Sequence, residues 1–227
     1  MPALVIGHRG APRRDVENSL GAFRAAVVAR VDGVELDIHS TTDGAFIVHH
    51  DEMFGTEHLS RLNAKQVGEL RLSNGEPLPT LEAVLDAVGD IQVFIEVKTL
   101  DPRFDSRLLE TIDQGPNPAG YAVHGFDHRI IARLGRLRPA LRRGVLSSSY
   151  PVNPLEDLTD AGAATLWEDH ALIDPALADT LHAARKQLIA WTVDDEAEMR
   201  RLLKLGVDGL CTNQPELCRR VVDEGRR

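Results

Sequence analysis

Short apolar runs alternate with amphipathic stretches along nearly the whole chain. Eight runs rich in strand-forming residues predict strands at 4–7, 34–38, 91–97, 121–125, 142–147, 164–168, 188–193 and 208–212. The stretches between them predict helices at 19–30, 81–88, 106–113, 128–137, 154–160, 175–185, 196–205 and 215–222. Thr80 and Asp174 stand at helix N-cap positions, and Pro175 suits a first helical turn. The pattern therefore indicates strands and helices in strict alternation.

This alternation predicts the fold class, because strands separated by helices form parallel sheets. Eight strand–helix units favour an α/β fold of the closed (β/α)8 kind, a TIM barrel. No linker divides the chain, so residues 1–227 are expected to form a single domain. The long connection at 52–79 follows a predicted hairpin and contains a helical patch at 64–70. We expect it to be a small insertion on the barrel rim.

Composition narrows the function classes. Of the 227 residues, 43% are hydrophobic, 27% are charged and 4% are aromatic, and the formal net charge is −9. These values are typical of a globular protein and not of a general nucleic-acid or anionic-membrane binder. No apolar run approaches the ~20 residues of a membrane span, and no signal-peptide pattern opens the chain. We expect a cytoplasmic protein without stable membrane insertion; the oligomeric state stays open.

Polar residues gather where the predicted strands end, which is where a TIM barrel carries its active site. His8 and Arg9 follow the first strand. In the second strand, side-chain alternation separates Glu35 and Asp37 from the apolar residues. The apolar face must meet the helices, so both carboxylates are expected to point into the barrel mouth.

The third strand repeats this pattern, with Glu96 and Lys98 on its inner face. Three buried carboxylates repel one another and need compensation. A divalent cation such as Mg²⁺, Ca²⁺ or Mn²⁺ would supply it, because hard ions prefer oxygen ligands. A network of salt bridges with Lys98 and Arg9 is the alternative that these residues leave open.

A hairpin after the second strand is predicted by the Asp-Gly pair at 43–44, which is typical of a two-residue turn. That loop pairs Asp37 with His50 and places their Cβ atoms roughly 5 Å apart. His50 would thus return to the mouth, whereas His49 would point to the opposite face. His39 shares the face of His50 but lies higher on the hairpin.

These side chains form the set that phosphodiester hydrolysis needs. Carboxylates can hold a cation, cationic side chains can clamp the anionic substrate, and two histidines can exchange protons near neutral pH. An alkoxide leaving group is too basic to depart without a proton. We therefore expect one site made of His8, Arg9, Glu35, Asp37, His50, Glu96 and Lys98.

A series of short motifs carries the pattern over nearly the full chain. They are His8-Arg9-Gly10, Glu17-Asn18-Ser19, Glu35-Leu36-Asp37, His50-Asp51, Glu96-Val97-Lys98, Trp191-Thr192-Val193 and Gly206-Val207-Asp208-Gly209. In this order and spacing, they resemble the glycerophosphodiester phosphodiesterase family. The resemblance implies metal-dependent hydrolysis of a small-molecule glycerophosphodiester to glycerol 3-phosphate and an alcohol.

The resemblance also implies roles for single residues. Glu35, Asp37 and Glu96 would bind one divalent cation, Mg²⁺ or Ca²⁺, and His8 and His50 would be the catalytic acid and base in an unassigned order. Three further roles concern the substrate and the rim: Arg9 and Lys98 would hold the phosphate, Trp191 would line the glycerol or leaving-group pocket, and Glu17 and Asn18 would brace the mouth.

Some positions depart from the family pattern. Residues 52–57 replace a common Arg-Thr-Thr stretch, Gly125 stands where the family has Ser, and Asn213 stands where Asp is common. None of these departures removes a proposed catalytic residue. A lysophospholipase D, a cyclising phospholipase-like enzyme and a non-catalytic phosphodiester-binding barrel remain alternatives.

Four other polar or aromatic residues fall near strand ends, and packing is the favoured interpretation for each. They are His124, Trp167, Glu168 and His170.

Overall fold

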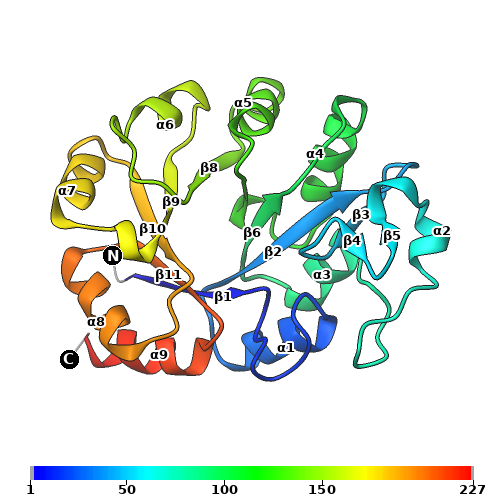
Figure 1. Cartoon of the computed structure of the whole chain (residues 1–227), viewed down its shortest axis with the longest axis horizontal. Helices are drawn as coiled ribbons and strands as arrows, with labels where there is room; N and C mark the ends of the chain where they lie inside the picture. The colour runs from blue at the N-terminus through cyan, green and yellow to red at the C-terminus, as the bar shows by residue number, and fades with distance from the viewer. Residues whose placement is uncertain (1–2, 226–227) are drawn as a thin grey trace.

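A computed structural model describes residues 3–225; residues 1–2 and 226–227, the ends of the predicted domain, lie outside the described residues. Neighbouring strands follow the order β1-β11-β10-β9-β8-β7-β6-β2, and β1 also pairs with β2, so the sheet closes (Figure 1). The predicted (β/α)8 barrel is confirmed. Its strands are β1 (Leu4–His8), β2 (Gly33–Ser40), β6 (Gln92–Val97), β7 (Tyr121–His124), β8 (Arg142–Ser147), β9 (Thr165–Asp169), β10 (Gln187–Trp191) and β11 (Gly209–Thr212).

Helices surround the barrel (Figure 1), and all eight predicted ones are present. They are α1 (Leu20–Val28), α3 (Leu81–Val88), α4 (Asp105–Gln114), α5 (His128–Leu137), α6 (Glu156–Asp160), α7 (Pro175–Ala183), α8 (Glu196–Leu205) and α9 (Pro215–Glu224). The predicted caps are confirmed, because the side chains of Thr80 and Asp174 accept hydrogen bonds from the first turns of α3 and α7. Within residues 3–225, no helix is long and apolar enough to cross a membrane.

The core has two layers, which follow from side-chain alternation in the strands. Outward residues such as Val34, Leu36 and Ile38 pack against the helices in one large cluster. Inward residues such as Phe94 and Trp167 fill the barrel interior. The carboxylates of β2 therefore lie on the inner side, as the alternation predicts.

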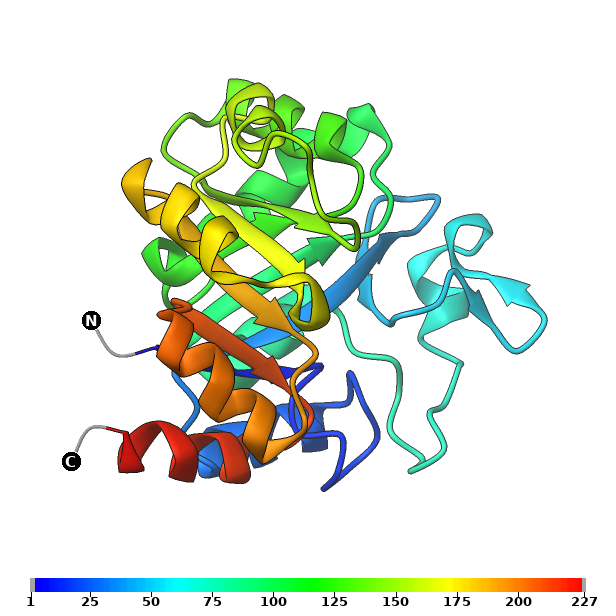
Figure 2. The ribbon, with the colours of Figure 1, turned by 60° about the vertical axis from the view of Figure 1, so that its left-hand side comes forward.

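The rim insertion has a small core of its own, which contains Ile47, Leu59 and Val67. It comprises β3 (Phe46–Val48), β4 (Met53–Phe54), β5 (Glu57–His58), the 3-10 turn η1 (Leu59–Arg61) and α2 (Ala64–Val67). In Figure 2 the barrel strands point toward the side on which this cyan segment projects. Helix α2 is shorter than the predicted patch at 64–70, and Gly68 is its C-cap residue.

The predicted hairpin register is wrong by one residue. The loop has three residues, because Thr41 donates its backbone N–H to Ala45 O at 2.9 Å and Gly44 N–H donates to Thr41 O at 3.1 Å. Gly44 has a positive φ of 80°, as the last residue of such a loop requires. Ile38 consequently pairs with Val48, and the residue opposite Asp37 is His49.

Candidate active site

The carboxyl ends of β1, β2, β6 and β7 meet at one cavity. It receives seven of the predicted site residues: His8, Arg9, Glu35, His50, Glu96, Lys98 and Trp191. Its other lining residues are His124, Phe126, Leu146, Trp167 and Cys211. His50 lines the cavity although its predicted register is wrong, and it lies two residues beyond the end of β3 at Val48.

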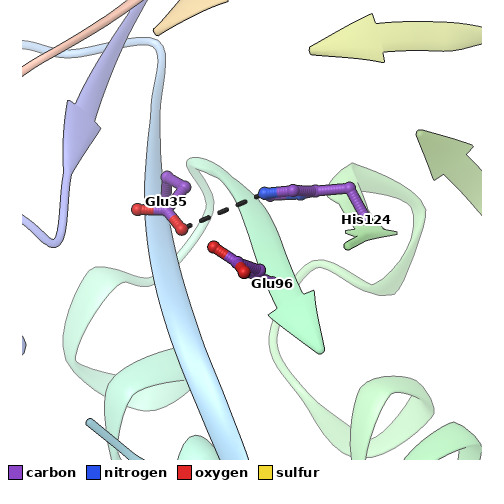
Figure 3. A group of neighbouring side chains, drawn as sticks. All are labelled: Glu35, Glu96 and His124. Carbon is purple, nitrogen blue, oxygen red and sulfur yellow. Dashed lines mark ion pairs between the residues drawn. The ribbon is translucent and has the colours of Figure 1, made fainter. Parts of the chain in front are cut away.

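Three buried side chains inside this cavity could hold a metal ion. Glu35 on β2, Glu96 on β6 and His124 at the end of β7 converge, and their ligand atoms all lie within 4.8 Å of one another (Figure 3). Strand register explains the meeting, because Glu96 is the partner of His124 on the neighbouring parallel strand. The set offers two carboxylate oxygens and one imidazole nitrogen, a donor combination used for divalent cations.

The electrostatics of these three groups fit a cation. Burial, together with repulsion from Asp37 and Glu96, raises the pKa of Glu35 well above its ordinary value. Burial and Asp37 raise the pKa of Glu96 to about 7, although Lys98 opposes the change. Burial lowers the pKa of His124 to about 3, so this ring stays neutral and keeps a free lone pair. Both ring nitrogens of His124 are buried, and neither has a hydrogen-bond partner within residues 3–225.

His124 lines the cavity, although the sequence favours packing as its role. It does stack on Trp167, with ring centroids 4.2 Å apart. Its Nε2 also lies 3.9 Å from Glu35 Oε1. The available signal was its position at the end of a strand next to the one that carries Glu96. Glu168 and His170 do not line the cavity, and His170 bonds Glu198 at 3.0 Å.

Asp37 lies outside this group of three. Its Oδ2 pairs with Arg9 Nε at 3.1 Å and accepts a hydrogen bond from Asn18 Nδ2 at 2.9 Å, and its Oδ1 lies 3.5 Å from Lys98 Nζ. Burial alone would raise the pKa of Asp37, but the charges of Arg9 and Lys98 lower it below the ordinary value. Asp37 thus lies among cations, and its role as a metal ligand stays a prediction.

The salt-bridge network that the sequence left open is present, but it covers only part of the cluster. Lys98 Nζ lies 2.9 Å from Glu96 Oε1, and Arg9 pairs with Asp37 and with Glu17, whose Oε1 is 2.9 Å from Arg9 Nη1. Glu35 accepts a bond from the backbone N–H of Arg9 at 3.2 Å. Among the described residues, no Lys or Arg side chain forms an ion pair with Glu35. An ionised Glu35 would therefore have no Lys or Arg side chain to pair with, which leaves room for a bound cation.

The two predicted catalytic histidines line the same cavity in different settings. His8 Nδ1 lies 2.8 Å from Asn213 Oδ1, and its Nε2 lies 3.9 Å from Glu35 Oε2. Burial and the charge of Arg9 lower the pKa of His8. His50 is more open, with about a third of its side chain exposed (35%), and its Nδ1 lies 2.8 Å from Asp51 Oδ1.

The two other hairpin histidines have packing and supporting contacts. His39 is buried, and its Nε2 lies 3.1 Å from the backbone oxygen of His50. His49 packs edge-on against Phe54, with ring centroids 5.4 Å apart. Trp191 packs edge-on against Phe126, with ring centroids 5.8 Å apart, and both residues line the cavity. The cavity lining therefore combines charged and apolar side chains.

The barrel mouth brings together two histidines, two cationic side chains and buried carboxylates, which are the groups that a phosphoric diester hydrolase uses. Residues 8–217 match the model of the glycerophosphoryl diester phosphodiesterase family. A glycerophosphodiester phosphodiesterase from Caldanaerobacter subterraneus subsp. tengcongensis is 31% identical over 244 residues, spanning 99% of this chain and 100% of the relative. The chain belongs to this family.

Solved structures agree on the fold. A glycerophosphodiester phosphodiesterase from Parabacteroides distasonis superposes with a TM-score of 0.89 at 24% identity, covering 100% of this chain and 99% of the other. A phosphodiesterase from Oleispira antarctica, solved in complex with the product sn-glycerol-3-phosphate, has a TM-score of 0.90 at 21% identity, covering 98% and 97%.

Proposed function

We propose that this enzyme hydrolyses glycerophosphodiesters to glycerol 3-phosphate and an alcohol, with one divalent cation bound at the mouth. The observation that carries the proposal is the meeting of His8, His50, Arg9 and Lys98 around the buried carboxylates in one cavity. The names of the relatives support it, as does the product bound by the Oleispira antarctica protein.

Glu35, Glu96 and His124 would hold the cation, and Asp37 would complete the set as the resemblance implies. Mg²⁺ and Ca²⁺ suit its carboxylates. When bound, a divalent cation supplies positive charge that neutralises a phosphoryl oxygen. Arg9 and Lys98 bind the remaining phosphate oxygens. Because Arg9 also pairs with Asp37 and Lys98 also pairs with Glu96, each cation must contact a carboxylate and the substrate at the same time.

His8 and His50 transfer the protons. One deprotonates the attacking hydroxyl, and the other protonates the departing alkoxide. The hydroxyl belongs either to water or to the glycerol group of the substrate. Attack by the glycerol hydroxyl would give a cyclic phosphate, so the first product formed distinguishes the two.

A lysophospholipase D activity is the second candidate, and exposed apolar residues favour it. Phe126 is 49% exposed and lines the cavity, and Tyr150 (44%) and Val152 (fully exposed) lie on the loop after β8, at the same end of the barrel. Such side chains could cover an acyl chain. Comparing turnover of glycerophosphocholine with that of lysophosphatidylcholine decides between the two substrates.

The test is release of glycerol 3-phosphate from glycerophosphocholine, measured with EDTA and after addition of Mg²⁺ or Ca²⁺. We expect turnover that EDTA abolishes and metal restores. The Glu35→Gln variant should need more metal, whereas a matched change of an exposed carboxylate, Glu69→Gln, should behave as the wild type. Binding without turnover under all conditions would instead support a non-catalytic barrel.

A further inference from the structure

A chain of side-chain hydrogen bonds lies behind His8. Asp194 follows β10, Asn213 follows β11 and His8 ends β1, and these three strands are consecutive neighbours in the barrel. Asn213 Nδ2 donates to Asp194 Oδ2 at 2.8 Å, and Asn213 Oδ1 lies 2.8 Å from His8 Nδ1. The three side chains thus form one connected row that ends at the cavity.

Asp194 determines which atoms of this row donate hydrogen bonds and which accept them. Its Oδ1 accepts two bonds, from the Asn213 backbone N–H at 2.8 Å and from the Thr212 hydroxyl at 3.0 Å. A carboxylate can only accept hydrogen bonds, so the atom of Asn213 that faces Oδ2 must be the amide nitrogen. A flipped amide would bring two acceptor oxygens together. The Asn213 carbonyl oxygen is therefore the atom that faces His8.

An acceptor at that position determines the tautomer of His8. A carbonyl oxygen accepts but does not donate, so Nδ1 must carry the hydrogen and a neutral ring then has its lone pair on Nε2. Glu35 Oε2 lies 3.9 Å from this nitrogen, beyond hydrogen-bond distance, and so does not hold a hydrogen on it. Nε2 is left free to accept a proton at the cavity.

We infer that Asn213 and Asp194 are positioning residues that hold His8 as the Nδ1–H tautomer, and that this neutral ring, whose Nε2 lone pair is open to the cavity, acts as the general base. The inference rests on the proposed function. The attacking hydroxyl gives its proton to His8 Nε2 as its oxygen bonds to phosphorus, while the bond from phosphorus to the leaving oxygen breaks and that oxygen takes a proton from His50. The Asp51 carboxylate beside His50 suits a protonated ring.

The test is two-bond ¹H–¹⁵N NMR of the histidine rings in Mg²⁺-supplemented protein, at a pH where His8 is neutral. The His8→Gln variant assigns the His8 signals. We expect a protonated Nδ1 and an unprotonated Nε2 in the wild type. Asn213→Ala should shift His8 toward the Nε2–H tautomer and lower kcat about 10- to 100-fold with little change in KM.

Two variants make the test specific. Gln214→Ala is the matched control, because the Gln214 side-chain amide donates a hydrogen bond to the backbone oxygen of Asp194 at 2.7 Å and is not part of the row that ends at His8. It should leave the His8 tautomer unchanged. The double variant Asp194→Asn with Asn213→Asp exchanges the two side chains. The new carboxylate at 213 still offers an oxygen to His8 Nδ1, and the new amide at 194 donates to that carboxylate. This protein should therefore recover the Nδ1–H tautomer and much of the kcat that Asn213→Ala loses.

An Nε2–H tautomer in the wild type would overturn the inference, and this measurement needs no variant to fold. So would an Asn213→Ala protein that retains both the Nδ1–H tautomer and kcat. Failure of the proposed function would look different: the tautomer would be as expected, but no diester would be cleaved.

Discussion

Replacing Glu96 by Gln should stabilise the protein in the absence of metal. The Glu96 side chain is 10% exposed and lies beside Asp37, and the pKa of its carboxyl group is raised from 4.5 to about 7. Unfolded chains lose this proton near pH 4.5, whereas the folded protein keeps it to about pH 7. Unfolding therefore releases a proton in this window, and the free energy of unfolding falls as the pH rises.

The magnitude follows from the difference between the two pKa values. At about 1.4 kcal/mol per pH unit, it corresponds to about 3 kcal/mol of stability lost above pH 7. Glu96→Gln removes this loss, so in EDTA the variant should be about 3 kcal/mol more stable than the wild type at pH 8. Below pH 4.5 the Glu96 side chain of the wild type is neutral, as the Gln side chain of the variant always is. The difference in the free energy of unfolding between the two proteins should therefore vanish.

Urea unfolding followed by the fluorescence of Trp167 and Trp191 at pH 8 and pH 4.5 measures both values. Glu69→Gln, an exposed change of the same kind, should shift stability by less than about 0.5 kcal/mol at either pH. Saturating Mg²⁺ or Ca²⁺ should stabilise the wild type more than Glu96→Gln. If Glu96→Gln is the less stable protein at pH 8 in EDTA, the contact with Lys98 outweighs burial and the reasoning is refuted.

Three further predictions concern the site. His124→Leu should fold but lose most of the rise in melting temperature that Mg²⁺ or Ca²⁺ gives the wild type; an unchanged rise would exclude His124 as a ligand. Arg9→Lys should lower kcat/KM despite the retained charge, since Lys cannot form a two-pronged contact with phosphate, and an unchanged value would count against phosphate binding by Arg9. His8→Ala and His50→Ala should each lower kcat about 10²- to 10⁴-fold on glycerophosphocholine, and on a nitrophenyl phosphodiester only His50→Ala should recover, because nitrophenolate leaves without a proton.

The register of the hairpin after β2 could not be predicted from its turn residues alone. An Asp-Gly pair marks a turn in either a two-residue or a three-residue loop, and the two differ by one position in register. The observed loop uses Asp43 to accept a bond from the backbone N–H of Ala64 at 3.0 Å, which anchors the insertion to the hairpin. That contact lies 21 positions along the chain, so the turn residues alone could not reveal it.

The sequence by itself determined the barrel and seven of the twelve residues that line its cavity. Strand and helix periodicities and capping residues are local properties, and alternation within β2 and β6 is enough to send Glu35 and Glu96 inward. The register between neighbouring strands, and with it the contacts that these groups make, was decided by the tertiary structure. His124 joins the carboxylates because β7 lies beside β6, and Asn213 reaches His8 across 205 positions because the barrel closes. The charged side chains that come into contact are set by the alignment of neighbouring strands and by burial. Neither can be read from the alternation of polar and apolar residues within one strand.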